Sequence, residues 1–376
     1  PTIAVVVGTR PEIIKLAPVI RELGTAATVI HTGQHYDDAL AGDLFAELGI
    51  GTPDVVLDGI GGVARSPQVG RMILALGELF DSLRPGAVIV QGDTNTVSAA
   101  AQAANYAGIP VVHVEAGLRS NDRGMPEEIN RLVVAALADV HCVPTLRSRD
   151  LLLREQIAAE SIALTGNTIV EATERALATA RAPKRRRHFV LATIHRPENT
   201  DTRRALIRVL DGLARIDAPV TLVAHPRTLS AIERFALSPM LASLTVIPPV
   251  GHRELLELAA SARLIVSDSG GLQEECTVVK TPLLVVRRST ERPESVDAGF
   301  SELAGPDADI ARLANRMLRD EGALDRLRRQ GSPFGDGHAS ARIAQIACAI
   351  AAGHAPQHAI RSLKSFTGAD RSARSA

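Results

Sequence analysis

The sequence has no tryptophan, two tyrosines and seven phenylalanines, so it offers few aromatic rings on which unpaired nucleic-acid bases could stack. It also lacks an excess of charge of either sign. Its 42 Lys and Arg residues balance 42 Asp and Glu residues, and the formal net charge is +0. Nonspecific binding to a polyanion requires a large positive excess. The composition therefore predicts that nucleic acid is not a partner.

Cysteine is scarce, and long apolar runs are absent. Cys142, Cys276 and Cys348 lie far apart and form no C-x-x-C pair, which argues against a disulfide framework or a zinc cluster and favours a reducing cytoplasm. No apolar stretch approaches the roughly 18 residues that a membrane span needs. His31 and His35 are four residues apart, but they lie at a predicted strand end, and we predict no metal site. We expect a cytoplasmic protein with no membrane partner.

The chain alternates short runs rich in Val and Ile with amphipathic stretches, which predicts α/β structure with parallel sheets covered on both faces. At 376 residues it is long enough for two domains. The predicted strands of the first domain are 2–7, 28–32, 87–91, 111–115, 140–143 and 162–164. Those of the second domain are 189–194, 220–224, 244–247, 264–267 and 283–286.

We therefore expect two Rossmann-like domains that face a central cleft, lined by the carboxyl ends of both sheets. The expected boundaries are 1–168 and 169–338, followed by a helix at 339–353 that could return to the first domain. Residues 354–376 are expected to fray. A basic run, Arg181–His188, is interpreted as a surface between the domains rather than as a nucleic-acid patch.

One glycine-rich segment is a weak candidate for a cofactor site. Residues 59–64 fit the dinucleotide-binding fingerprint, with Ala64 as the last small residue. The fingerprint must close a strand and open a helix, and Arg65-Ser66-Pro67 is expected to interrupt the chain before any helix begins. We therefore interpret the segment as a flexible loop, and expect the helix only from Gly70 to Leu83.

Two turns have the composition of anion sites. In the first, Gly8–Glu12 follows the first strand, and Pro11 occupies a position that favours a helix start. Backbone amides and Arg10 would bind an anion there, although an ordinary helix start has the same pattern. In the second, Ser269-Gly270-Gly271 follows a strand and opens a helix that carries Glu274 and Glu275.

The second turn suits a diphosphate at a helix N-terminus, with Ser269 donating a further hydrogen bond. Glu274 and Glu275 would repel the phosphates unless one of them reaches past to a ribose diol. The alternative is a glycine-rich turn followed by a solvated acidic helix.

Three carboxylates follow strands or open a helix in the first half of the chain. Asp93 and Glu115 end neighbouring strands, and Glu127 begins a later helix. Carboxylates that converge at one sheet edge push their pKa values apart, which suits a general acid and a general base. Asp93 could instead cap a helix, and Glu127 could be a first-turn residue. His195 ends the first strand of the second half, where it faces the expected cleft or serves a structural role.

Together these motifs resemble the non-hydrolysing UDP-N-acetylglucosamine 2-epimerases over nearly the whole chain, from residue 8 to about 340. The matching motifs are GTRPE at 8–12, QGDT at 91–94, HVEAGLR at 113–119, MPEEINR at 125–131, TGNT at 165–168, HRPEN at 195–199, DSGGLQEE at 268–275 and TERPE at 290–294.

The resemblance implies a glycosyltransferase-B architecture, a homodimer, a UDP-sugar substrate and no metal or redox cofactor. The residues it implies for binding substrate and UDP are Arg10, Lys15, Arg119, Ser269, Gly270, Gly271 and Glu275. Those it implies for catalysis are Asp93, Glu115, Glu127 and His195, with His195 stabilising the leaving UDP.

The implied reaction is C2 epimerisation of UDP-GlcNAc to UDP-ManNAc, by elimination of UDP to 2-acetamidoglucal and re-addition. The alternatives are an epimerase of a UDP-diacetamido uronic acid, a hydrolysing epimerase that releases ManNAc, a glycosyltransferase of the same fold, and a non-enzymatic nucleotide-sugar sensor. The pattern departs from the family at Asp38, which stands where an allosteric Q-H-x-x-M segment has Met, and at Pro197, which replaces the second Arg of an HRRE motif.

Overall fold

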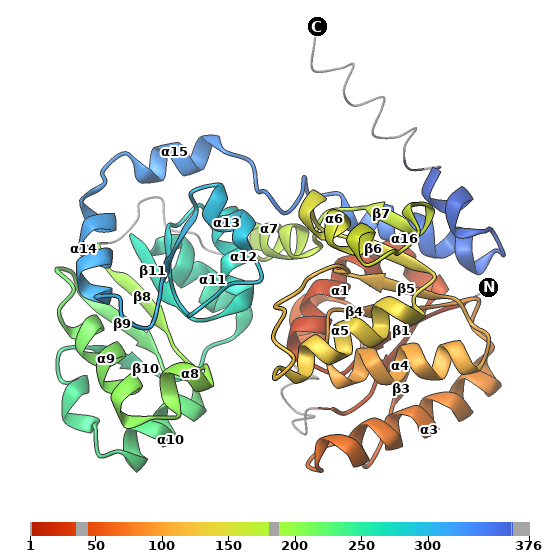
Figure 1. Cartoon of the computed structure of the whole chain (residues 1–376), viewed down its shortest axis with the longest axis horizontal. Coiled ribbons are helices and arrows are strands. Elements are labelled where there is room, and N and C mark those ends of the chain that lie inside the picture. Colours follow the sequence, from red (N-terminus) through yellow and green to blue (C-terminus); the bar gives the residue numbers. More distant parts are fainter. Residues whose placement is uncertain (1, 35–43, 180–187, 362, 364–376) are drawn as a thin grey trace, which may run out of the picture. The chain divides into compact units, whose positions relative to one another are not determined.

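The computed structural model describes residues 2–34, 44–179, 188–361 and 363. Two compact units divide the chain: unit 1 comprises Pro1–Ala172 with Phe334–Ala376, and unit 2 comprises Thr173–Pro333 (Figure 1). His35 and Asp38 of the departing motif, residues 181–187 of the basic run, and the tail beyond 363 lie outside the described residues.

Unit 1 contains, in its described part, a seven-stranded parallel sheet of order β3-β2-β1-β4-β5-β6-β7. The strands are β1 (Ile3–Val7), β2 (Ala27–His31), β3 (Val55–Val56), β4 (Ala87–Gln91), β5 (Val111–Val114), β6 (Val140–Val143) and β7 (Ile162–Leu164). Its helices include α1 (Arg10–Leu23), α3 (Arg65–Leu83), α4 (Asn95–Tyr106), α5 (Pro126–Leu137), α6 (Leu146–Arg154), α7 (Ile169–Thr179), which continues into unit 2, and α16 (Ala339–Ala351), and residues 44–48 and 356–361 are also helical.

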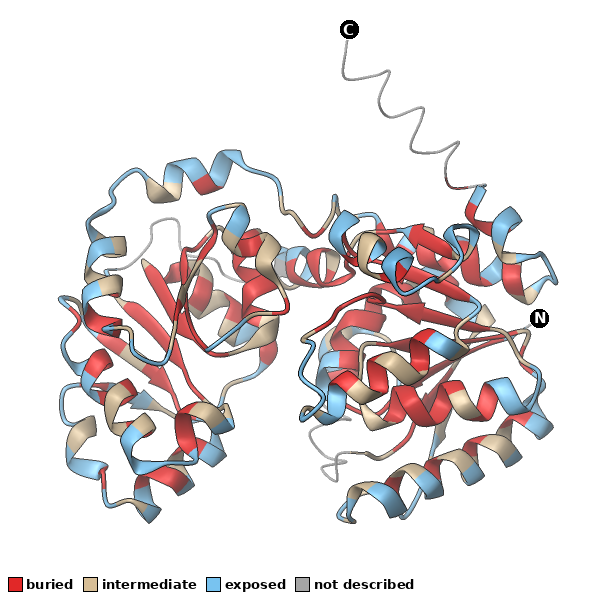
Figure 2. Ribbon diagram, viewed as in Figure 1, coloured by how far each residue is buried: buried red, intermediate tan, exposed pale blue. Residues whose placement is uncertain are grey.

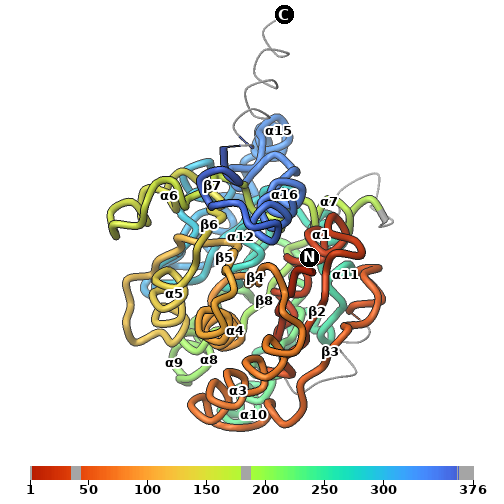
Figure 3. Tube along the Cα trace, turned by 90° about the vertical axis from the view of Figure 1, so that its right-hand side faces the viewer, coloured from red at the N-terminus to blue at the C-terminus, as the bar shows by residue number. Residues whose placement is uncertain are grey.

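The central strands of this sheet are apolar on both faces because helices cover both. All five residues of β1 are buried, as Figure 2 shows for the strands generally. Ala4 and Val6 pack into a core with side chains of α3 and α4. Helix α16 packs against α1, and both contact β1 and β4 (Figure 3). Helix α16, far along the chain from β1, is therefore part of unit 1.

Unit 2 contains, among the described residues, a six-stranded parallel sheet of order β10-β9-β8-β11-β12-β13. The strands are β8 (Val190–Thr193), β9 (Val220–Val223), β10 (Thr245–Ile247), β11 (Leu264–Ser267), β12 (Leu283–Val286) and β13 (Ser301–Ala304). The helices are α8 (Pro197–Thr200), α9 (Arg203–Ala214), α10 (Pro226–Arg234), α11 (His252–Ser261), α12 (Gly270–Val279), α13 (Pro293–Asp297), α14 (Ile310–Arg319) and α15 (Ala323–Arg329).

The two sheets share one feature that positions functional groups. In each, the order reverses beside the first strand, between β1 and β4 in unit 1 and between β8 and β11 in unit 2. Ligands of open parallel sheets bind outside the carboxyl ends of the strands at this reversal. The predicted α/β class with two Rossmann-like sheets is confirmed, and the candidate residues follow these strand ends.

Some predicted details are wrong. Helix α3 begins at Arg65, five residues before the predicted start, because a proline such as Pro67 is tolerated in the first turn of a helix. The glycine-rich segment therefore does lead into a helix, but it follows the short edge strand β3 rather than the sheet reversal. Strands β3 and β13 were not predicted. No helix in the described ranges is long and apolar enough to cross a membrane.

Candidate active site

The turn after β1 brings the backbone very close to its neighbours. A Cβ atom at Gly8 would lie 2.0 Å from Thr96 Oγ1 and 2.3 Å from Thr32 Oγ1, so only glycine fits there. Helix α1 then starts at Arg10, with Pro11 in its first turn. The preceding Thr9 makes no side-chain cap, and Arg10 is exposed. The helix N-terminus thus presents its amides beside a cation, as an anion site requires.

Glu12 in the same turn has a role that the sequence did not reveal. Its carboxyl is buried and accepts hydrogen bonds from the Gly8 amide at 3.0 Å and from Thr94 Oγ1 at 2.7 Å. Burial raises the pKa of Glu12 to about 7, even though these hydrogen bonds act to lower it. The side chain therefore ties the end of β1 to the loop that follows β4.

Glu115 is held in an unusual backbone conformation at the end of β5. Its φ angle is +63°, in the left-handed region, which costs a non-glycine residue about 1–3 kcal/mol. The buried carboxylate forms an ion pair with buried Lys15. Gln91 Nε2 donates to it at 3.1 Å and Asn167 Nδ2 at 3.3 Å. Lys15, predicted as a substrate ligand, thus contacts the predicted catalytic carboxylate.

Asp93 lies in the loop after β4 and pairs with Arg131, whose Nε donates to Asp93 Oδ2 at 2.8 Å. Asn130 Nδ2 donates to the Asp93 carbonyl at 2.8 Å. The cap of α4 is Thr94, which accepts from the Val97 amide, so the alternative of Asp93 as a helix cap is wrong. Helix α5 therefore fixes Asp93 in position, which the sequence did not predict.

Glu127 and Glu128 are neighbours with different environments. Glu128 is buried and accepts from the Ser120 amide at 2.9 Å, the Asn121 amide at 3.0 Å and Arg131 Nη1 at 2.8 Å. Burial acts to raise its pKa, but these hydrogen bonds outweigh it and the pKa is lowered. Glu127 is exposed in the first turn of α5. Glu128 thus holds the loop, while the carboxylate of Glu127 faces solvent.

Arg119 and His113 serve the frame of unit 1. The Arg119 guanidinium is buried and donates to both carboxylate oxygens of Glu155, at 2.7 and 2.6 Å. Glu155 thus neutralises the charge of Arg119. The contact of Arg119 with substrate stays a prediction. His113 Nε2 lies 2.8 Å from the Gly92 carbonyl, and burial lowers the pKa of His113 to about 4. This neutral imidazole supports the turn just before Asp93.

In unit 2, a fully buried carboxylate organises the loop after β8. Asp268 accepts hydrogen bonds from the His195 amide at 3.0 Å, the Arg196 amide at 2.9 Å and Asn199 Nδ2 at 2.9 Å. His195 Nδ1 lies 3.2 Å from the same carboxylate. Burial lowers the pKa of His195, although Asp268 opposes the shift. A hydrogen bond from Nδ1–H to Asp268 leaves Nε2 of His195 for a ligand.

The glycines at the start of α12 lie beside two guanidinium groups. A Cβ atom at Gly270 would lie 3.0 Å from Arg292 Nη1 and 3.8 Å from Arg196 Nη2. Ser269 is the N-cap of α12 and accepts from the Leu272 amide. Gly271 follows in the first turn of α12, where a Cβ atom would lie no closer than 3.9 Å to the side chain of a non-adjacent residue. The predicted anion turn thus has two cations, Arg196 and Arg292, that were not predicted from the sequence.

The two carboxylates of α12 are buried, so the alternative of a solvated acidic helix is wrong. Glu274 pairs with Arg292 Nε at 2.6 Å and thereby positions that guanidinium. Glu275 Oε1 lies 2.7 Å from His252 Nε2 on α11. Within the described residues, no group of three or more His, Cys, Asp and Glu side chains could hold a metal ion.

Comparison with known proteins places these features in a family. The family model described as UDP-N-acetylglucosamine 2-epimerase matches residues 20–347. The chain is 39% identical over 364 residues to the UDP-N-acetylglucosamine 2-epimerase of Methanococcus maripaludis, covering 92% of this chain and 97% of that protein. It is 35% identical to the UDP-2,3-diacetamido-2,3-dideoxy-D-glucuronate 2-epimerase of Pseudomonas aeruginosa, covering 91% of this chain and 98% of that protein.

A solved structure agrees with these sequence matches. The crystal structure of the Methanocaldococcus jannaschii UDP-GlcNAc 2-epimerase, in complex with UDP-GlcNAc and UDP, superposes with a TM-score of 0.82 and 37% identity. The match covers 92% of this chain and 99% of that chain.

Proposed function

The chain belongs to the UDP-N-acetylglucosamine 2-epimerase family, and we propose that it inverts C2 of UDP-GlcNAc to give UDP-ManNAc, by eliminating and re-adding UDP. The observation that carries this proposal is the start of α12, where Arg196 and Arg292 flank Gly270. Two cations at a helix N-terminus stabilise the negative charge that a departing diphosphate develops.

We assign the nucleotide to unit 2. Ser269, Gly270 and Gly271 bind the diphosphate together with His195. Glu275 reaches the ribose diol, and its hydrogen bond to His252 would hold it in place for that contact. The neutral imidazole of His195 donates a hydrogen bond from Nδ1 to Asp268. When Nε2 takes up a proton, it can donate a second hydrogen bond to a phosphate oxygen.

We assign the sugar chemistry to unit 1. The C2 hydrogen of UDP-GlcNAc is barely acidic, so the C1–O bond breaks first and builds oxocarbenium character that acidifies C2–H. A carboxylate among Asp93, Glu115 and Glu127 takes this proton, which gives 2-acetamidoglucal and UDP. A proton then reaches C2 from the opposite face, a UDP oxygen attacks C1, and UDP-ManNAc results.

These reaction steps neither oxidise nor reduce the sugar, so they require no redox cofactor. Guanidinium groups supply the positive charge at the phosphates. We further propose a cytoplasmic homodimer, on the strength of the family. Sedimentation equilibrium at micromolar concentration tests the dimer, and a monomer across the whole concentration range would contradict it.

Proton NMR of UDP-GlcNAc turnover in deuterated water tests the reaction. We expect UDP-ManNAc that carries deuterium at C2, with traces of 2-acetamidoglucal and UDP after long incubation. UDP-ManNAc that retains protium at C2 would contradict the elimination. Accumulation of free ManNAc would indicate hydrolysis instead.

A second candidate substrate is a UDP-diacetamido uronic acid, which the Pseudomonas aeruginosa relative favours. The same experiment with UDP-2,3-diacetamido-2,3-dideoxy-glucuronate distinguishes the two candidates by their kcat/KM values. Faster turnover of the uronate would assign the chain to that substrate.

A further inference from the structure

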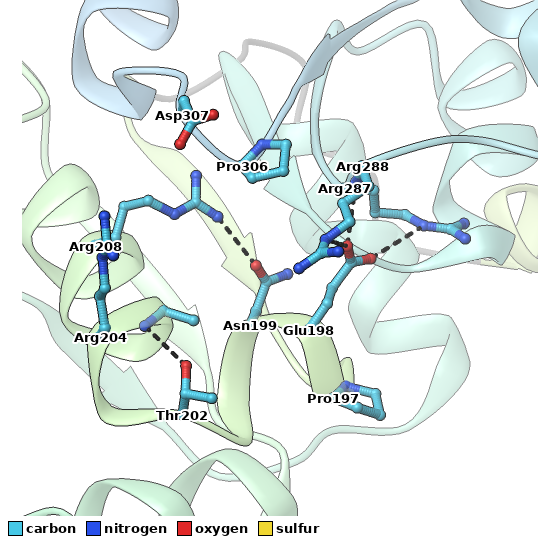
Figure 4. A pocket seen from close by; sticks show the side chains of 11 residues that line it. Pro197, Glu198, Asn199, Thr202, Arg204, Arg208, Arg287, Arg288, Pro306 and Asp307 are labelled. Atoms are coloured by element: carbon cyan, nitrogen blue, oxygen red, sulfur yellow. Dashed lines mark hydrogen bonds and ion pairs between the residues drawn. The ribbon is translucent and has the colours of Figure 1, made fainter.

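Unit 2 contains a pocket that the proposed reaction does not use. It has a volume of about 610 Å³ and lies between α8, the start of α9 and the loops that follow β12 and β13 (Figure 4). It is lined by none of the residues assigned above to UDP or to the sugar. Four of its lining residues are arginines: Arg204, Arg208, Arg287 and Arg288.

The arginines on one wall are already balanced by carboxylates. Both Nη atoms of Arg287 donate to the carboxylate of Glu291 at 2.8 Å. The Arg288 amide donates to Glu198 at 3.1 Å, and the Arg288 Nε lies 4.0 Å from the same carboxylate. This wall therefore has little unpaired charge to offer a ligand.

The arginines on the opposite wall, formed by α9, are not balanced. Arg204 and Arg208 are four residues apart on one helix face, where like charges repel. Arg208 donates to two neutral acceptors, the Gly305 carbonyl and Asn199 Oδ1, each at 3.2 Å. In the described part of the chain, no carboxylate lies within ion-pairing distance, 4.0 Å, of either guanidinium. Burial lowers the pKa of Arg208, although the charges of Glu198 and Asp307 at longer range oppose the shift.

Two groups beside these arginines suit hydroxyl groups. Asp307 borders the pocket from the loop after β13, near Arg208 in Figure 4. Thr202 caps α9 by accepting from the Ala205 amide at 3.2 Å, and its hydroxyl proton can still be donated. The first turn of α9 adds amide groups that favour an anion.

We propose that this pocket is a second anion site, which binds the phosphate of a small phosphorylated sugar through Arg204 and Arg208 and its hydroxyl groups through Asp307 and Thr202. Guanidinium forks match the oxygens of a phosphate, and the volume accommodates one sugar ring. Binding at this pocket is independent of the proposed reaction, because it involves residues that the reaction does not use.

Isothermal titration with glucose 6-phosphate, as a probe of this ligand class, tests the site in the presence and absence of saturating UDP. We expect binding at one site under both conditions, weaker binding of inorganic phosphate, and none of glucose. Arg204→Gln and Arg208→Gln should each weaken glucose 6-phosphate binding about tenfold, since each removes a charged hydrogen-bond donor. Arg203→Gln, which removes an exposed arginine from the same helix outside the pocket lining, should leave the affinity unchanged.

Arg204→Gln keeps the test valid if Arg208→Gln unfolds, because Arg204 is exposed and its side chain has no hydrogen bond to the described residues. Asp307→Asn should weaken the binding of glucose 6-phosphate and strengthen the binding of inorganic phosphate. The proposal is overturned if glucose 6-phosphate does not bind, if UDP displaces it, or if Arg204→Gln and Arg203→Gln bind it equally well. If UDP itself does not bind, the proposed function is contradicted. The titration of glucose 6-phosphate without UDP would still test the pocket.

Discussion

The strand order in unit 2 repeats that of the first six strands in the sheet of unit 1, but the charges at the strand ends are arranged in opposite ways. In unit 1, cations hold carboxylates: Lys15 pairs with Glu115, and Arg131 pairs with Asp93. In unit 2, a buried carboxylate positions a cation, since Glu274 pairs with Arg292. The fold therefore does not decide the chemistry of a strand end. We propose that the sign of the group facing the ligand determines this chemistry, and that the buried partner of that group sets its position.

Removing a carboxylate from unit 1 is the strongest way to separate the two arrangements. Asp93→Asn preserves the shape but removes a base or acid, so kcat should fall by about 10²–10⁴-fold. UDP affinity should stay unchanged, because unit 2 is assigned to the nucleotide. Steady-state kinetics and calorimetric titration of UDP measure the two effects, with Glu78→Gln, exposed on α3, as the control. Loss of UDP binding in Asp93→Asn would break the division between the units.

Removing the cation that holds Glu115 tests whether it positions the carboxylate. Lys15→Met leaves Glu115 buried without its ion pair, which should lower the free energy of unfolding by about 3–5 kcal/mol. Turnover should fall with it. The double variant Lys15→Met/Glu115→Gln should recover most of the stability but not the activity, since it removes the unpaired charge. Urea unfolding followed by circular dichroism measures this, and a single variant as stable as the wild type would refute the role of the pair.

Glu12 sharpens the comparison because its hydrogen-bond partners, the Gly8 amide and Thr94, are neutral. Its pKa is raised from 4.5 to about 7 in the folded protein, so the folded state retains a proton that the unfolded state releases. Stability should therefore decrease as the pH rises from about 4.5 to 7, by about 3 kcal/mol. Glu12→Gln should abolish this part of the pH dependence. Unfolding free energies at several pH values measure the slope, and identical slopes in both proteins would contradict the raised pKa.

Sequence patterns predicted the strand ends after which the candidate groups lie, because periodicity and turn residues are local signals. They did not predict the partners. Lys15 and Glu115 are 100 residues apart, and Arg131 and Asp93 are 38 apart, so only the folded sheet brings them together. Patterns also could not separate Glu127 from Glu128, since neighbouring residues of a helix start differ only in which side is buried.

The smallest expected effect concerns a carboxylate of unit 2 that is predicted to touch the ligand. Glu275→Gln replaces a charged acceptor of the ribose hydroxyls with a neutral one, and UDP binding should weaken by about 1–3 kcal/mol. Turnover at saturating substrate should be nearly unchanged, because the ribose is remote from C1 and C2 and its binding is equal in the ground and transition states.

His252 provides the decisive arm of that test, since its Nε2 lies 2.7 Å from Glu275 Oε1. If His252 acts only by orienting Glu275, His252→Ala should weaken UDP binding in the wild-type background and have little further effect in Glu275→Gln. Glu254→Gln, exposed in the first turn of the same helix α11, is the matched control. Additive losses would mean that His252 contacts the nucleotide itself. A loss of kcat without a loss of UDP affinity in Glu275→Gln would place chemistry in unit 2, and the contrast between the two units would then fail.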